Sequence, residues 1–105
     1  SAASDVYKRQ VDAVSDKAKD NTPAFCTGDF NATPDAPEIA TTICQSGILK
    51  DAYREATIQH GALFTFPSKK TRIDFIFVKH ATVLSTRTIV SSLSDHYPMV
   101  IVVEI

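Results

Sequence analysis

Three short segments hold the residues of this 105-residue sequence that can do chemistry. The first, TGDFN, places Asp29 and Asn31 on either side of Phe30, directly after a short apolar run. Side chains two positions apart in extended backbone point the same way, so Asp29 and Asn31 are expected to project together while Phe30 turns toward the core. The carboxylate can orient or deprotonate an attacking water, and the amide can donate to a phosphoryl oxygen. The alternative interpretation is a simple turn.

The second segment, RIDFIFV, places a carboxylate inside a strand that is otherwise apolar on both faces. Asp74 shares one face with Ile76 and Val78, and aromatic residues fill the other. An unpaired carboxylate in such a place costs several kcal/mol, so Asp74 requires a partner or a proton. Arg72, two positions earlier, would make the pair structural, whereas a histidine would make it functional.

The third segment, LSDHYP, supplies that histidine. Adjacent side chains in extended chain point apart, so Asp95 and His96 can serve different groups. If His96 donates one ring N–H to Asp74, its tautomer is fixed and its other nitrogen is left for a substrate. Asp95 is then available for a hard cation such as Mg²⁺, which prefers a few oxygen ligands with water and substrate phosphate. Pro98 stiffens the turn that holds both groups.

Secondary structure that can position these segments is readable from apolar spacing. Residues 23–27, PAFCT, read as a buried strand that ends at TGDFN. A helix should follow, capped by Thr33 or Asp35 with Glu38 closing a capping box, and stopped by Gly47. The segment ILKDAYREA is ambiguous between a helical turn and a loop. Four strands are then expected, at residues 62–66, 72–78, 82–90 and 99–105.

This order predicts an α/β (α+β) layered sandwich with a mixed, largely antiparallel sheet. We interpret residues 1–10 as a non-native or disordered leader and residues 11–105 as a single domain or part of one. A helical stripe through Tyr7, Val11, Val14 and Ala18 spans the boundary between them.

Composition limits the classes of partner. The net charge of −1 gives no basic footprint for unspecific nucleic-acid binding, and no apolar run approaches the ~20 residues of a membrane helix. The one basic run, at residues 69–72, is either a solvated turn or a patch that steers phosphate. Several other polar residues are interpreted as structural or surface groups: Arg54, Glu55, His60, His80 and Arg87.

TGDFN, RIDFIF and SDHYP, in this order, resemble the C-terminal motifs of the endonuclease/exonuclease/phosphatase superfamily, whose members are metal-dependent phosphoesterases with a DNase I-like fold. The resemblance runs from about Pro23 to Ile105. It implies the C-terminal half of a four-layer sandwich and in-line attack of water on a phosphate ester, with Mg²⁺ or Mn²⁺ as cofactor. The substrate class stays open among nucleic acid, phospholipid and sugar phosphate.

The same resemblance implies roles for five residues. Asp29 and Asn31 position the water and stabilise the pentavalent phosphorus, Asp74 orients the catalytic His96, and Asp95 with Asp29 holds the metal. The family also carries an upstream metal-binding Glu, but the first Glu of this sequence is Glu38. We therefore expect a C-terminal fragment whose partner is the missing N-terminal half of the domain.

Two alternatives remain at this point. One is a catalytically inactive fragment. The other is an unrelated β-rich binding module, in which Asp74 would pair with Arg72 rather than with His96.

Overall fold

The structure is a computed structural model, and it describes residues 9, 12–13, 21–44 and 49–105. The expected leader and most of the expected first helix lie outside the described residues, although Arg9, Asp12 and Ala13 are helical. Gly47 also lies outside them. The described elements follow in the order β1 (Ala24–Asp29), α2 (Pro37–Ile39), the π-helical turn η1 (Ala40–Cys44), β2 (Lys50–Asp51), α3 (Ala52–Glu55), β3 (Ile58–Gly61), β4 (Asp74–Lys79), β5 (Thr82–Thr88) and β6 (Met99–Glu104).

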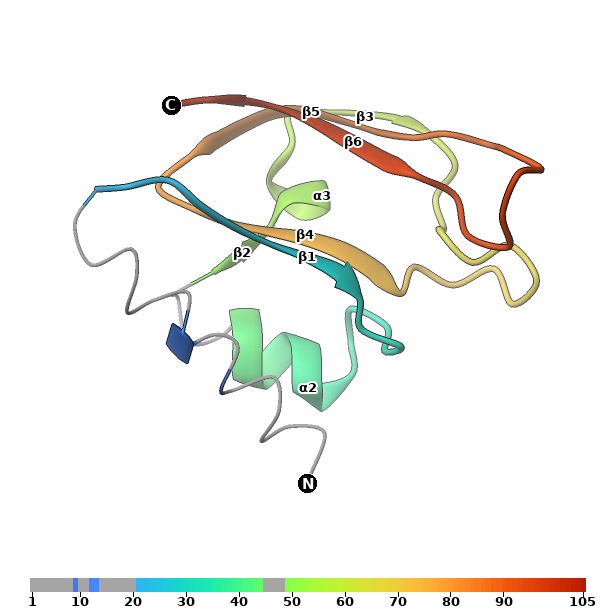
Figure 1. Cartoon of the computed structure of the whole chain (residues 1–105), viewed down its shortest axis with the longest axis horizontal. Helices are drawn as coiled ribbons and strands as arrows, with labels where there is room; N and C mark the ends of the chain where they lie inside the picture. The colour runs from blue at the N-terminus through green and yellow to red at the C-terminus, as the bar shows by residue number, and fades with distance from the viewer. Residues whose placement is uncertain (1–8, 10–11, 14–20, 45–48) are drawn as a thin grey trace.

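The strands form two three-stranded sheets, with the orders β1-β4-β2 and β3-β5-β6. All pairs are antiparallel except β3 with β5, which is parallel. In Figure 1, α2 lies on one side of the β1-β4 sheet and the β3-β5-β6 sheet lies on the other. The layered α/β sandwich predicted from the sequence is therefore confirmed, with one antiparallel sheet and one mixed sheet rather than a single mixed sheet.

Alternation along β4 separates two cores, as RIDFIFV predicts. Phe75 and Phe77 are buried against α2 and η1 in a cluster with Phe30. Val78 packs on the opposite face in a second cluster with Val83 of β5. The side chain of Asp74 emerges on this second face, between the two sheets, because cross-strand and i+2 neighbours share a face.

Two local expectations are wrong. The helix after β1 is capped by Ala36 without a side-chain hydrogen bond, since the Thr33 hydroxyl donates to Asp35 instead. No strand runs through residues 62–66. Here the chain turns back at Pro67, and Thr65 and Phe66 both donate backbone N–H groups to the carbonyl of Thr71.

The strand in this region comes earlier, at β3, where Gly61 meets the carbonyl of Thr88. A Cβ at position 61 would lie 2.0 Å from that oxygen, and φ is +85°, so glycine is required there. None of the helices within the described ranges is long and apolar enough to cross a membrane.

Candidate active site

Two carboxylates face each other at one end of the β1-β4 sheet. The register of these antiparallel strands places Asp29 opposite Asp74, so both side chains lie on the same face. Asp29 is 48% exposed and Asp74 is 23% exposed. Like charges directly opposite one another repel, so this end of the sheet favours a group that carries positive charge.

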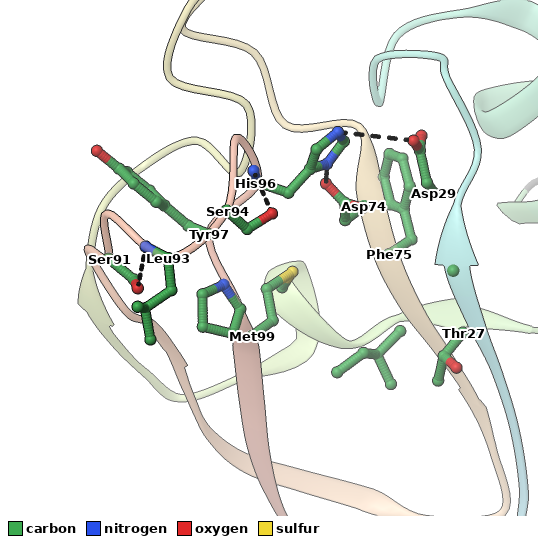
Figure 2. Close-up of a pocket in the computed structure, with 13 residues that line it drawn as sticks. Thr27, Asp29, Asp74, Phe75, Ser91, Leu93, Ser94, His96, Tyr97 and Met99 are labelled. Carbon is green, nitrogen blue, oxygen red and sulfur yellow. Dashed lines mark hydrogen bonds and ion pairs between the residues drawn. The ribbon is translucent and has the colours of Figure 1, made fainter.

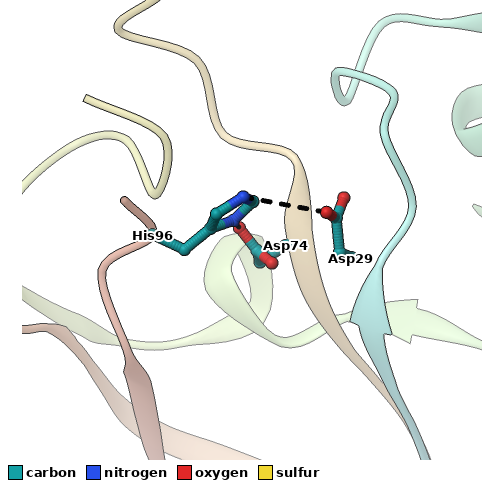
Figure 3. A group of neighbouring side chains, drawn as sticks. All are labelled: Asp29, Asp74 and His96. Carbon is teal, nitrogen blue, oxygen red and sulfur yellow. Dashed lines mark hydrogen bonds and ion pairs between the residues drawn. The ribbon is translucent and has the colours of Figure 1, made fainter. Parts of the chain in front are cut away.

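His96 supplies that group from the loop that precedes β6. Its Nδ1 lies 2.7 Å from Asp74 Oδ2, and its Nε2 lies 3.8 Å from Asp29 Oδ2 (Figure 3). An ionised carboxylate can only accept a hydrogen bond, so the proton of this short contact lies on Nδ1. The Nδ1–H group of His96 therefore donates a hydrogen bond to Asp74. The predicted Asp74–His96 pairing is present, and Nε2 is turned toward Asp29.

Surrounding carboxylates favour the protonated imidazole. The hydrogen bond to Asp74 is the largest cause that raises the pKa of His96 above its ordinary value, and partial desolvation opposes it. The negative charges of Asp74, Asp29 and Asp95 raise the pKa further. His96 can thus carry a positive charge at a higher pH than a solvent-exposed histidine.

Thr65 holds both sides of this pair in place. Its buried hydroxyl accepts hydrogen bonds from the backbone N–H groups of Ile73 and Asp74, at 3.1 and 3.2 Å. Its carbonyl accepts the N–H of Tyr97 at 2.7 Å. One residue therefore connects the start of β4, which carries the carboxylate, to the loop that carries the imidazole.

Aromatic contacts and a side-chain cap fix the loop further. The Phe66 ring lies 4.9 Å from the His96 ring, and Phe64 stacks on Tyr97 at 6.1 Å, both between ring centroids. The Ser94 hydroxyl accepts the backbone N–H of His96. The hydrogen bond to Asp74, the Phe66 ring and the Ser94 hydroxyl together restrict the orientation of His96. A catalytic or binding group has to keep one orientation in this way.

A cavity of about 600 Å³ opens beside the pair, between the end of β1-β4 and the loop before β6 (Figure 2). Asp29, Asp74 and His96 contribute its polar wall. Its remaining wall is mostly apolar, with Ile76 and Met99 among its residues. The arrangement combines a few convergent polar groups with apolar walls, as small-molecule sites commonly do.

Arg72 does not pair with Asp74. It makes two hydrogen bonds to Asp51, at 3.1 and 2.7 Å, and both side chains are buried. Its guanidinium carbon also lies 4.4 Å from the centre of the Tyr53 ring. The pairing expected for an unrelated binding module is therefore wrong, and the ambiguous segment that contains Asp51 forms the short β2 and α3.

Asn31 occupies a different position from the one predicted. Its φ of 50° is left-handed, not extended, because its backbone N–H turns back to donate to Asp29 Oδ1 at 2.8 Å. Asn31 therefore does not line the cavity of His96, but a second one on the other side of this turn. Phe30, between them, is buried as predicted.

The oxygen donors near His96 suit a hard cation. Asp29, Asp74 and His96 each offer a ligand atom, and these atoms lie within 4.8 Å of one another. Asp74 and His96 already satisfy each other, so the exposed carboxylate of Asp29 is the more available donor. Asp95 is exposed on the same loop as His96 and accepts a weak hydrogen bond from Ser94 at 3.4 Å. Carboxylate oxygens of this kind fit Mg²⁺ or Mn²⁺.

Sequence reasoning missed three residues of this region. Thr65 and Phe66 lie in a segment that reads as an apolar strand, and Asp51 lies in one that reads as helix or loop. A serine or threonine within an apolar run is a weak signal of a buried polar contact, whereas nothing in the sequence marks Phe66 as the neighbour of an imidazole.

The chain is similar to known proteins in sequence pattern and in fold. The sequence pattern of the Endonuclease/Exonuclease/phosphatase family matches residues 2–96. A solved endonuclease/exonuclease/phosphatase from Bacteroides vulgatus is 29% identical, with a TM-score of 0.79 over 95% of this chain and 44% of its own. A mannosyl-6-phosphatase from Bacteroides thetaiotaomicron is 24% identical, with a TM-score of 0.76 over 94% of this chain and 46% of its own.

The chain thus spans less than half the length of these solved structures. A comparison with curated proteins gave no match.

Proposed function

The chain belongs to the endonuclease/exonuclease/phosphatase family, and from that membership we propose that this site hydrolyses phosphate esters by in-line attack of water. A single observation carries the proposal: His96 is held by Asp74 through Nδ1 while its Nε2 faces Asp29 at 3.8 Å. A carboxylate-oriented imidazole beside a second carboxylate, in an open cavity, suits acid–base chemistry at a polar bond.

In the proposed reaction, His96 binds the phosphoryl group. With Nδ1 committed to Asp74, the protonated ring has one remaining N–H, at Nε2, which can donate to a phosphoryl oxygen as negative charge builds there. The raised pKa of His96 supports this role because it widens the pH range over which the ring carries a positive charge. Asp74 is the residue that sets the tautomer and the ring orientation.

Asp29 is proposed to accept the proton of the attacking water. Its exposed Oδ2 reaches toward the space beside His96 Nε2, so a water bound to it would lie next to a phosphoryl group held by the histidine. The water oxygen forms a bond to phosphorus, the ester P–O bond breaks, and the leaving oxygen takes a proton from solvent. Asn31, at the same turn, is proposed to donate its amide to the phosphoryl group from the opposite side.

Asp29 and Asp95 are proposed to hold the Mg²⁺ or Mn²⁺ ion. The support is chemical: both are exposed carboxylates close to His96, and Mg²⁺ sites commonly use one or two carboxylates with water and substrate phosphate. When bound, the ion would supply charge neutralisation at the phosphoryl oxygens.

The partner expected from the sequence also remains a proposal. β1 and β6 are edge strands in the described part of the chain, and both flank the site. Phe25 of β1 is 43% exposed, and Val100 and Val102 of β6 are about half exposed. Such apolar edges suit pairing with further strands, and we propose that the other half of the domain supplies them.

Hydrolysis by the purified chain tests the proposed function. A phosphodiester and a phosphomonoester, each with a nitrophenyl leaving group, are assayed with Mg²⁺ and with EDTA. His96→Ala and Asp29→Ala are expected to lower kcat/KM by ~10²-fold or more, because each removes a group that acts on the transition state. His80→Ala and Asp35→Ala are the matched controls, since both residues are exposed and lie outside the cavity. Turnover that survives His96→Ala, or that never depends on added metal, contradicts the mechanism.

A further inference from the structure

A second cavity, of about 450 Å³, lies on the other side of the Asp29–Asn31 turn. Its lining includes Asn31, Glu38, Phe66, Lys69 and Thr71. The proposed hydrolysis uses only Asn31 among them. The basic run singled out in the sequence contributes here through Lys69, which the tight turn at residues 66–71 carries to the rim.

This cavity adjoins the reacting centre at three points. Asn31 is bonded through its backbone to Asp29 Oδ1. Phe66 lines the cavity and also contacts the His96 ring. Ile73, a further lining residue, directly precedes Asp74. A phosphate held between His96 and Asp29 would therefore lie next to this second cavity.

Polar side chains of the cavity have hydrogen-bonding capacity to spare. The side chains of Asn31, Glu38 and Lys69 form no hydrogen bond or ion pair with any described residue. Glu38 offers a carboxylate acceptor and Lys69 an ammonium donor to the rest of the ligand, whereas the Asn31 amide is assigned to the phosphoryl group. Phe66 adds an apolar ring face. Such a mixture matches a ring that carries several hydroxyl groups, each of which both donates and accepts.

The charge of the second cavity argues against a polyanionic ligand such as a nucleic-acid strand. One carboxylate and one ammonium leave the lining without net charge, and the whole chain carries −1. Nucleic-acid strands are bound by rows of Lys and Arg that neutralise successive phosphates. Glu38 would instead repel a second phosphate group placed in this cavity.

We infer that the second cavity binds the uncharged polyhydroxyl part of a sugar phosphate, with Glu38 and Lys69 as the residues that select it. This inference rests on the proposed phosphate-ester hydrolysis, because the phosphate end of the ligand is assigned to His96 and Asp29. It names the substrate class of that site as sugar phosphates, not nucleic-acid strands.

Binding to the 105-residue chain tests this inference without requiring turnover. Backbone amide shifts are followed by NMR, with Mg²⁺ present, during titration with glucose 6-phosphate, inorganic phosphate or a thymidine dinucleotide. Glucose 6-phosphate is expected to bind ~100-fold more tightly than inorganic phosphate, because the added hydrogen bonds to the charged groups of Glu38 and Lys69 each contribute on the order of tenfold. The additional shifts should fall at residues 31–38 and 66–71.

Substitutions of single residues test which side chains of the second cavity contact the sugar. Glu38→Gln and Lys69→Met are each expected to weaken glucose 6-phosphate about tenfold. Glu55→Gln and Lys79→Met are matched controls, because both residues lie outside this cavity. The amide spectra also report whether each variant stays folded.

Three results would overturn the inference: equal affinity for glucose 6-phosphate and inorganic phosphate, unchanged binding in both cavity variants, or tighter binding of the dinucleotide. The proposed hydrolysis is contradicted by a different result, namely turnover that does not depend on His96 or on metal. Failure of the sugar subsite and failure of the catalytic assignment are therefore read from different measurements.

Discussion

Asp29 and Asp74 lie directly opposite each other on β1 and β4, and the imidazole of His96 faces both carboxylates. The two strands alone would bring two negative charges together at the end of a sheet. The loop before β6 offsets this repulsion by delivering a ring that can carry a proton. The site therefore depends on three segments that are distant in sequence and on the protonation state of one of them.

Titration of His96 should show a pKa above the ordinary value of about 6.5. A proton bound more tightly in the folded state stabilises that state. This contribution is fully present below about pH 6.5 and is lost as pH rises through the folded-state pKa. Asp74→Asn should lower the pKa, because it removes the largest cause of the shift. Ring C–H signals in NMR report it, with Glu104→Gln as a distant control. An unchanged pKa in Asp74→Asn would argue against the hydrogen bond.

Asp29→Asn should separate stability from activity. With His96 neutral at alkaline pH, the substitution removes a like charge opposite Asp74 and is expected to stabilise the fold by ~0.2–1 kcal/mol. The Asn side chain can still accept the N–H of Asn31. At acid pH the gain should shrink, because the attraction to protonated His96 is lost as well. Urea unfolding at both pH values checks this, and a loss of stability at alkaline pH would contradict the arrangement.

Thr65→Val should cost ~1–3 kcal/mol of unfolding free energy, because it leaves the N–H groups of Ile73 and Asp74 without their buried acceptor. Thr65→Ser keeps the hydroxyl and should retain most of the unfolding free energy of the original chain. Thr57→Val is the exposed control. Thermal unfolding measures stability, and the His96 ring signals show whether the loop has moved. Equal stability of the Val and Ser variants would remove Thr65 from this role.

Asp95→Asn should weaken Mn²⁺ binding by ~10-fold or more, since the affinity of oxygen-ligand sites depends on the number of charged ligands. Calorimetry on the purified chain measures the affinity directly and needs no substrate. Asp35→Asn, which removes an exposed carboxylate on the helical side of the sheet, is the matched control. Equal loss in both variants would indicate unspecific charge attraction instead of a site.

The sequence pattern correctly predicts a structural feature where the cause of that feature lies in neighbouring residues. Alternation in RIDFIFV correctly separates the buried faces of β4, because side chains in any strand point to opposite sides in turn. Phe30 is buried next to exposed Asp29 for the same reason. The need of Asp74 for a partner also follows from composition, since a carboxylate in an apolar strand is costly when unpaired.

The identity of that partner was decided only by the tertiary structure. Arg72 and His96 are both plausible partners of Asp74 from sequence. Arg72 instead donates two hydrogen bonds to Asp51, which lies twenty-one residues away in a segment with ambiguous local preference. The tertiary structure likewise places Asn31 in left-handed backbone and makes Thr65 the link between the start of β4 and the loop before β6. Each of these outcomes depends on groups that meet across the fold. Sequence therefore determined which residues can do chemistry, and packing of distant segments determined which of them meet.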